Sequence, residues 1–250
     1  MDGNKALQRF VIFSSARSGS GMLQTLLDGH SQIKCYGETF NPSSRYGYVK
    51  WMKNSFYRRT LNKYFRDYLV DNYLDSLFLG ESSNDNEAIG FKVMYPGQFN
   101  RCSRFRYYWW INNFKIIRLT RRNLLRRFVS SQIAAKEGVW KAKKNRGNAI
   151  SIKVDTNDLI QAFYRMETWD RTIDSIAQEF RNLMVDYESL ISNRENIMRS
   201  VYSFLSVNEN EAEYIKPKSA RQNPSDISEL IENYDEVYSA LQNTQYEYFL

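Results

Sequence analysis

A loop of small and basic residues follows the first apolar run of the chain. Phe10–Phe13 is typical of a buried strand, residues 14–21 read SSARSGSG, and hydrophobic residues at helical spacing follow. In such a loop, backbone N–H groups converge on an anion, and the helix N-terminus adds partial positive charge. Arg17 adds a full charge and a planar set of donors. The pattern predicts a site for a terminal phosphate or sulfate on Arg17, Ser18, Gly19, Ser20, Gly21 and Met22.

This loop differs from the Walker A loop of nucleoside-triphosphate enzymes. That motif requires Gly-Lys followed by Ser or Thr. Here no Lys follows Gly19 or Gly21, and the cation, Arg17, precedes the glycines. A P-loop-type kinase of a small metabolite is therefore disfavoured, although it stays the alternative enzyme class.

Strands and helices alternate along the chain. Strands are expected at 10–13, 89–95, 115–120 and 183–187, and a short extended piece at 149–154. Helices are expected at 22–27, within 45–79, and at 124–135, 157–180, 196–205 and 225–241. This order predicts an α/β fold in one domain, residues 1–250, with a central, mainly parallel sheet flanked by helices. Ligands in such folds lie at the carboxyl ends of the strands.

The composition of the chain limits the classes of partner and of metal site that are expected. The net charge of +7 favours anionic partners. Two cysteines and one histidine exclude a disulfide framework and the usual zinc sites, so we expect no metal and a reducing, cytoplasmic location. No segment has the length of a signal sequence core or a membrane span, and the aromatic run at 107–111 is expected to be core.

The loop resembles a segment of a known family. Arg17-Ser18-Gly19-Ser20-Gly21-Met22-Leu23 is similar to the 5′-phosphosulfate-binding loop of sulfotransferases that use 3′-phosphoadenosine 5′-phosphosulfate (PAPS). The family loop runs Lys or Arg, Ser, Gly, Ser or Thr, Thr, then a bulky residue. Gly21 replaces the second Thr, so one hydroxyl contact to phosphate is missing.

Further likenesses follow in the same order as in the family. Arg122 and Ser130 have the spacing of its 3′-phosphate site, with Arg121 as a rival for the arginine role. Tyr187 resembles the family's tyrosine beside the nucleotide, although a core role for it is equally open. Lys218 and Arg221 are weaker candidates, in a basic loop that the family places over the nucleotide.

The resemblance implies a P-loop-like sulfotransferase fold, PAPS as donor, its product PAP, and a small acceptor such as a carbohydrate or polar metabolite. Lys92 matches the family's catalytic Lys, while Met94 occupies the position of the base His in the cytosolic branch. Glu38, in Gly37-Glu38-Thr39, resembles the glutamate base of carbohydrate and bacterial members. The implied catalytic residues are therefore Glu38, Lys92 and Arg17.

Several alternatives remain at this point. A basic, aromatic surface also suits a nucleic-acid-binding protein, but the candidate Arg and Ser residues fall at strand ends rather than along one stripe, so we expect no nucleic acid partner. A nucleotide-binding protein of this fold without turnover is kept open by Gly21. His30 follows the end of the first helix, and a capping or packing role suffices for it. The acceptor, the choice of hydroxyl or amine, and oligomerisation are not readable from the sequence.

Overall fold

The computed structural model describes residues 7–41, 69–79, 86–101, 104–140, 150–217 and 226–250. Two predicted site residues, Lys218 and Arg221, lie outside these ranges. Two predicted segments lie mostly outside them as well: residues 137–148, whose Gly, Lys and Arg content predicts an exposed loop, and the helical region at 45–79.

A parallel sheet forms the centre of the described structure. Its strands are β1 (Gln8–Ser15), β2 (Ile33–Cys35), β3 (Ala88–Tyr95), β4 (Lys115–Thr120) and β5 (Asn182–Asp186). They lie in the order β2-β3-β1-β4-β5, and every neighbouring pair is parallel. The predicted fold class is confirmed. β2 was not predicted, because three residues are too few to show a pattern.

The register brings the carboxyl ends of the central strands together. On β1, Ser14 pairs with Met94 of β3 and with Leu119 of β4. Residues that follow β1, β3 and β4 therefore emerge at one edge of the sheet, where an α/β fold binds its ligands.

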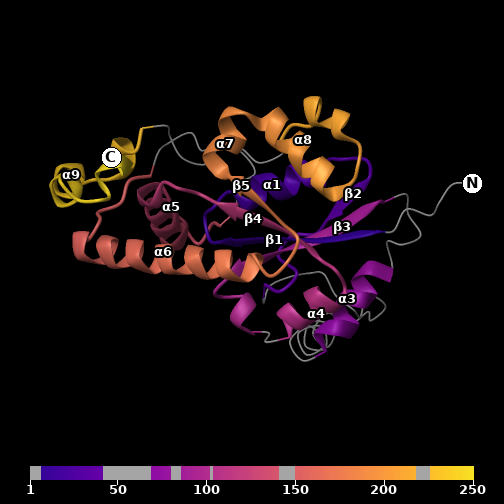
Figure 1. Cartoon of the computed structure of the whole chain (residues 1–250). Coiled ribbons are helices and arrows are strands. Elements are labelled where there is room, and N and C mark those ends of the chain that lie inside the picture. The colour runs from indigo at the N-terminus through magenta and orange to yellow at the C-terminus, as the bar shows by residue number, and fades with distance from the viewer. Residues whose placement is uncertain (1–6, 42–68, 80–85, 102–103, 141–149, 218–225) are drawn as a thin grey trace, which may run out of the picture.

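Helices cover both faces of the sheet (Figure 1). One face carries α1 (Ser20–Leu27), α7 (Tyr187–Ser192) and α8 (Arg194–Leu205), which pack on residues such as Phe10 and Ile12. The other face carries α3 (Val70–Leu79), α4 (Phe105–Ile111) and the end of α6 (Thr156–Ala177), around Val11 and Phe13. The start of α6 packs with α5 (Leu124–Glu137) and α9 (Tyr234–Leu241) in a third cluster. Short 3₁₀ turns occur at Phe99–Arg101, Glu209–Glu213, Ser228–Leu230 and Glu247–Phe249.

Two expectations were wrong in part. The predicted helix at 225–241 is a 3₁₀ turn, Ser228–Leu230, followed by Ile231, which bridges to Ile152, and then by α9. The Asp226 carboxylate accepts hydrogen bonds from the Ser228 amide and hydroxyl, and this local turn competes with helix. The aromatic run forms α4, a helix that the sequence reading missed: it buries Tyr108 and Trp109 but exposes Tyr107, Trp110 and Ile111.

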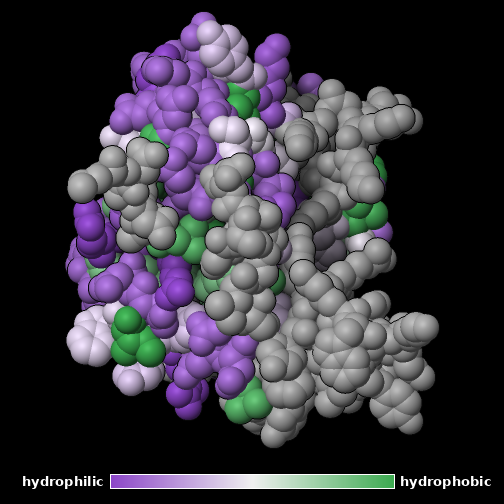
Figure 2. All heavy atoms as spheres, turned by 90° about the vertical axis from the view of Figure 1, so that its right-hand side faces the viewer, coloured by the Kyte–Doolittle hydropathy of each residue, from purple (hydrophilic) through white to green (hydrophobic). Residues whose placement is uncertain are grey.

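The surface is mostly polar on the face shown in Figure 2, where hydrophobic residues appear only in small separate groups among the described residues. Within the described part of the chain, none of the helices is both long and apolar enough to cross a bilayer.

Candidate functional site

The loop after β1 has the backbone of an anion site. Arg17 and Gly19 have φ angles of 62° and 89°, and α1 begins at Ser20. A Cβ atom on Gly19 would lie 2.2 Å from the ring of Tyr187, so glycine is required there both by φ and by space. The Met22 and Leu23 amides donate to the Gly19 carbonyl at 2.9 and 3.3 Å, so the loop leads directly into the N-terminus of α1, the end of a helix that favours an anion.

The loop hydroxyls have different environments. Ser18 is buried, and its hydroxyl donates to the Ser15 carbonyl at 2.8 Å, which closes the turn. The Ser20 hydroxyl lies 3.8 Å from the sulfur of Met94. A Cβ atom on Gly21 would meet no atom of the described residues within 4 Å, so they leave open the space that a Thr side chain would take there.

Arg17 and Ser130 are brought together, although 113 positions separate them. Nε and Nη2 of Arg17 donate to the Ser130 hydroxyl at 2.9 and 2.8 Å, and Nη1 donates to the Trp140 carbonyl at 2.9 Å. Ser130 lies on α5, which begins after Asn123 at the end of β4. The resemblance assigned these two residues to opposite ends of one nucleotide, whereas the structure joins them directly by hydrogen bonds.

Arg121 lies closer to the loop than Arg122 does. Its Nη1 donates to the Arg17 carbonyl at 3.3 Å, and its guanidinium lies 4.7 Å from the centre of the Tyr187 ring. Burial lowers the pKa of Arg121. Tyr187 thus contacts both Gly19 and Arg121, and its place beside a nucleotide stays a prediction.

Arg122 occupies a different position, at the rim. Its side chain is 67% exposed, and Nε lies 2.9 Å from the Asp186 carboxylate. Glu188 accepts hydrogen bonds from the backbone amides of Arg122 and Asn123 at 3.1 and 3.2 Å. The role of Arg122 at a 3′-phosphate stays a prediction, and Arg121 is a second candidate for it.

Glu38 and Lys92 form an ion pair. The Lys92 ammonium lies 3.0 Å from Oε1 of Glu38, and their side chains are 2% and 19% exposed. Oε2 of Glu38 accepts from the side-chain amides of Asn41 and Gln98, both at 2.9 Å. A buried ammonium needs such a partner, and Glu38 supplies it. Met94 stands next to this pair on β3 and contacts the hydroxyls of Ser14 and Ser20, which links the pair to the loop.

A buried cluster behind the loop was not predicted. Arg127 on α5 is 1% exposed and donates to the hydroxyl of Ser15 and the carboxylate of Asp170 on α6. The Ser15 hydroxyl donates to Asp170 at 3.1 Å. The signal was present, because Arg127 falls between Leu124 and Phe128 on the apolar face of α5.

His30 has the structural role that its position suggested. Its ring is buried, Nε2 lies 2.8 Å from the Asn208 carbonyl, and Nδ1 accepts from the Gln32 amide at 3.0 Å. The ring also packs on Tyr202, with centres 4.5 Å apart. These contacts join β2 to the turn after α8.

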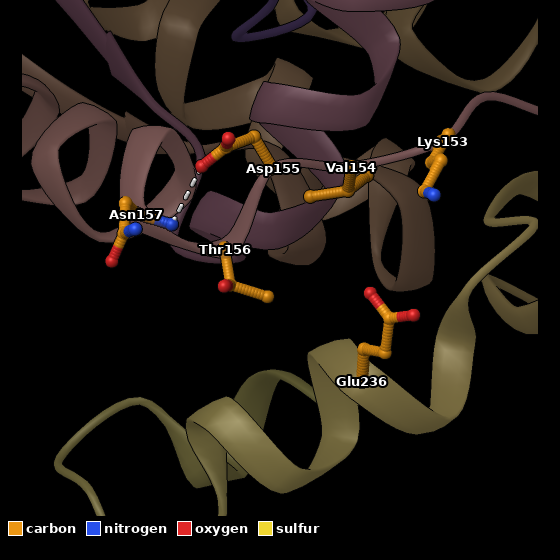
Figure 3. A pocket seen from close by; sticks show the side chains of 6 residues that line it. All are labelled: Lys153, Val154, Asp155, Thr156, Asn157 and Glu236. Atoms are coloured by element: carbon orange, nitrogen blue, oxygen red, sulfur yellow. Dashed lines mark hydrogen bonds between the residues drawn. The ribbon is translucent and has the colours of Figure 1, made fainter.

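A cavity of about 410 Å³ lies elsewhere, between the start of α6 and α9 (Figure 3). Its lining is Lys153, Val154, Asp155, Thr156, Asn157 and Glu236. Asp155 is already engaged as the N-cap of α6. Among the described residues, none with a predicted role lines it, so we place the candidate site at the loop, where charge and hydrogen-bonding groups converge.

The fold and the loop define the class of protein as a parallel α/β protein with a loop of Gly and Ser residues between its first strand and first helix. A sulfotransferase from Alicyclobacillus acidocaldarius has a similar structure, with a TM-score of 0.52, 16% identity and coverage of 95% of both chains. The chain therefore has the sulfotransferase fold, as the resemblance implied.

Other solved structures are similar at lower scores. The sulfotransferase domain of the Synechococcus PCC 7002 olefin synthase has a TM-score of 0.47 and 16% identity, over 85% of this chain and 78% of that one. A mouse sulfotransferase complexed with PAP has a TM-score of 0.44 and 12% identity, over 100% of this chain and 76% of that one. Neither a protein-family profile nor a curated protein sequence matches the chain.

Proposed function

We propose that this protein is a sulfotransferase that moves a sulfuryl group from PAPS to a hydroxyl or amine of a small acceptor. The observation that carries the proposal is the Glu38–Lys92 ion pair beside the loop, 3.0 Å between charged atoms. It sets a carboxylate that can take a proton next to a cation that can stabilise a leaving phosphate.

With a hydroxyl acceptor, the transfer is a single in-line displacement at sulfur. The acceptor oxygen forms a bond to sulfur in line with the breaking bond between sulfur and the 5′-phosphate oxygen. Glu38 accepts the acceptor's proton, and the negative charge passes to the phosphate oxygen of PAP. Lys92 and Arg17 stabilise that developing charge.

The donor would lie along the loop. Residues 17–22 would hold the 5′-phosphosulfate through backbone N–H groups and Arg17, and Ser130 with Arg122 or Arg121 would hold the 3′-phosphate. The ring of Tyr187, in contact with Gly19, supports a place for it beside the nucleotide. Lys218 and Arg221 remain candidates from sequence alone.

The role of Glu38 is tested by Glu38→Gln. We expect PAP formation from PAPS, with a panel of hydroxyl and amine acceptors, to fall about 100-fold or more, because a general base is lost. Calorimetric affinity for PAP should stay within about twofold of wild type, because binding and proton transfer use different groups. Glu87→Gln, at the opposite end of the sheet, is the matched control. Unchanged turnover in Glu38→Gln would remove Glu38 as base.

The 3′-phosphate assignment is tested with Arg122→Ala and Arg121→Ala. Loss of a charge-assisted hydrogen bond should weaken PAP binding about tenfold or more. Binding of AMP, which lacks the 3′-phosphate, should change much less. Equal losses for both nucleotides in both variants would reject an arginine at the 3′-phosphate.

The wild-type protein decides between this function and its alternatives. Preference for ATP over PAP would favour the kinase. Tight PAP binding without PAP formation from PAPS, across the acceptor panel, would favour a nucleotide-binding protein without turnover, for which the open space at Gly21 is the supporting observation.

A further inference from the structure

Gln98 is a buried amide in the turn after β3. Its side chain lies between the end of the strand and the 3₁₀ turn Phe99–Arg101, and the residue is 6% exposed. Its backbone amide donates to the Met94 carbonyl at 2.9 Å, which folds the turn back onto the strand. Neither its residue type nor its place after Pro96-Gly97 marked it in the sequence.

Both ends of the Gln98 carboxamide have partners. Its Oε1 accepts the backbone N–H of Met94 at 3.2 Å, and its Nε2 donates to Oε2 of Glu38 at 2.9 Å. A backbone N–H can only donate, so it fixes which end of the carboxamide is oxygen. The NH₂ group of Gln98 therefore faces Glu38. An amide NH₂ group cannot accept a proton from the acceptor substrate, so Gln98 itself is not the base.

The hydrogen bond from Gln98 affects both the orientation and the ionisation of the Glu38 carboxylate. Two amide donors, Asn41 and Gln98, engage Oε2, while Lys92 faces Oε1. Donors to a carboxylate favour its ionised form, which is the form a general base needs before it reacts. Asn41 follows Glu38 in the same loop, whereas Gln98 ties the carboxylate to the end of β3, the strand that carries Lys92.

We propose that Gln98 is a positioning residue, which holds the Glu38 carboxylate ionised and oriented by linking it to the Met94 backbone at the end of β3. The proposal rests on the proposed function, because Glu38 is the base there. In this scheme Gln98 contacts neither PAPS nor the acceptor substrate, and it acts only through Glu38.

The chain offers a matched control for this amide. Gln32, before β2, makes the same pair of bonds at the other end of the sheet: its Oε1 accepts the Asn208 amide at 2.8 Å, and its Nε2 donates to the Glu87 carboxylate. Gln98→Met and Gln32→Met remove equivalent bonds and keep an unbranched side chain of similar size. A loss of stability common to both variants measures the structural part of the effect.

The first measurement is the rate of PAP formation from PAPS against pH, with the acceptor found in the panel. For Gln98→Met we expect kcat to fall about tenfold or more, with the KM for PAPS within about twofold of wild type. The acidic limb of its kcat profile should move to higher pH, because a donor that favours the ionised carboxylate is gone. Gln32→Met should leave kcat and this limb unchanged. Equal kinetics in the two variants would overturn the proposal.

The second measurement does not need turnover. The side-chain amide signals of Gln98, assigned by their absence in Gln98→Met, are followed by NMR against pH in the wild type and in Glu38→Gln. We expect them to shift with pH only when Glu38 is present. Signals that ignore pH and the Glu38 substitution overturn the proposal. Failure of the wild type to bind PAP would instead remove the proposed function. The amide signals would still decide whether Gln98 is coupled to the ionisation of Glu38.

Discussion

Gly19 is the residue on which the loop depends most directly. Its φ of 89° is one that L side chains avoid, and its Cα faces the Tyr187 ring. Arg17 also has a positive φ, so two of three consecutive residues take left-handed backbone to turn the chain from β1 into α1. A residue with a side chain at position 19 would push Tyr187 away from the site.

The expected result for Gly19→Ala is a loss of both stability and nucleotide binding. The left-handed backbone alone costs about 1–2 kcal/mol for a residue with a Cβ atom. For a chain of this size that corresponds to a fall in Tm of about 2–8 °C, before the clash with Tyr187 is counted. Gly21→Ala is the control for stability, because a Cβ atom there meets no atom of the described residues within 4 Å. Thermal unfolding and PAP calorimetry of both variants check this, and equal behaviour would contradict the geometry.

At the scale of elements, helices α5 and α6 fix the loop from behind. Arg127 lies on the apolar face of α5 and Asp170 lies on α6, and the two meet at the Ser15 hydroxyl. A buried ion pair of this kind is costly to break, because removal of one partner leaves the other charge without compensation. The end of β1 is therefore held by side chains from two helices as well as by the sheet.

Asp186 lies between β5 and α7 and caps the N-terminus of α7, and its contribution to stability depends on pH. Although burial opposes its ionisation, the Ser189 amide and hydroxyl and Arg122 lower the pKa of Asp186 overall. A carboxyl group whose pKa is lower in the folded than in the unfolded state stabilises the fold at pH values above its unfolded-state pKa. This contribution is lost as the pH falls through the lowered pKa of the folded state. Asp186→Ala should lower the free energy of unfolding by about 1 kcal/mol at pH 7, and by less near pH 3.

Urea unfolding of Asp186→Ala at several pH values measures this effect. Asp186→Asn is the matched variant, because asparagine keeps the cap and loses the charge. We expect Asp186→Asn to lose less stability than Asp186→Ala at pH 7 and to approach the wild type in acid. A loss that is constant with pH would show that the charge of Asp186 contributes nothing.

For the whole molecule, local patterns were enough to predict the sheet and the loop. The runs that became β1, β3, β4 and β5 are apolar and alternate with helical patterns, so their positions and the parallel direction of the sheet could be predicted, although the order of the strands was not. The loop, Glu38 and Lys92 were found because each lies in a short motif. Arg127 and Gln98 were missed because their partners are distant: Ser15 lies 112 positions from Arg127, and Glu38 lies 60 positions from Gln98. The position of Arg127 on the apolar face of α5 indicates burial, but contacts of that range are set by packing, so no spacing in the sequence identifies the partners.

The reactivity of the Cys35 thiol can show whether β2 unfolds together with the rest of the fold. It lies on β2, at the edge of the sheet, yet it is 2% exposed, and burial followed by the nearby Asp28 raises the pKa of its thiol. A raised thiol pKa leaves little of the reactive thiolate in the folded state at pH 8. In a Cys102→Ser variant, where Cys35 is the sole thiol, labelling by a thiol reagent should therefore require opening of the structure.

The dependence of this labelling on urea distinguishes global from local opening. His30 and its contacts with Asn208 and Tyr202 join β2 to α8 and the turn after it, so we expect β2 to open only with the core of that face. The labelling rate of Cys35 should then rise with urea as steeply as the global unfolding constant does. A rate that is nearly independent of urea would mean that β2 detaches alone. In that case Glu38, three residues beyond β2, would be held by Lys92 and Gln98 rather than by its own strand.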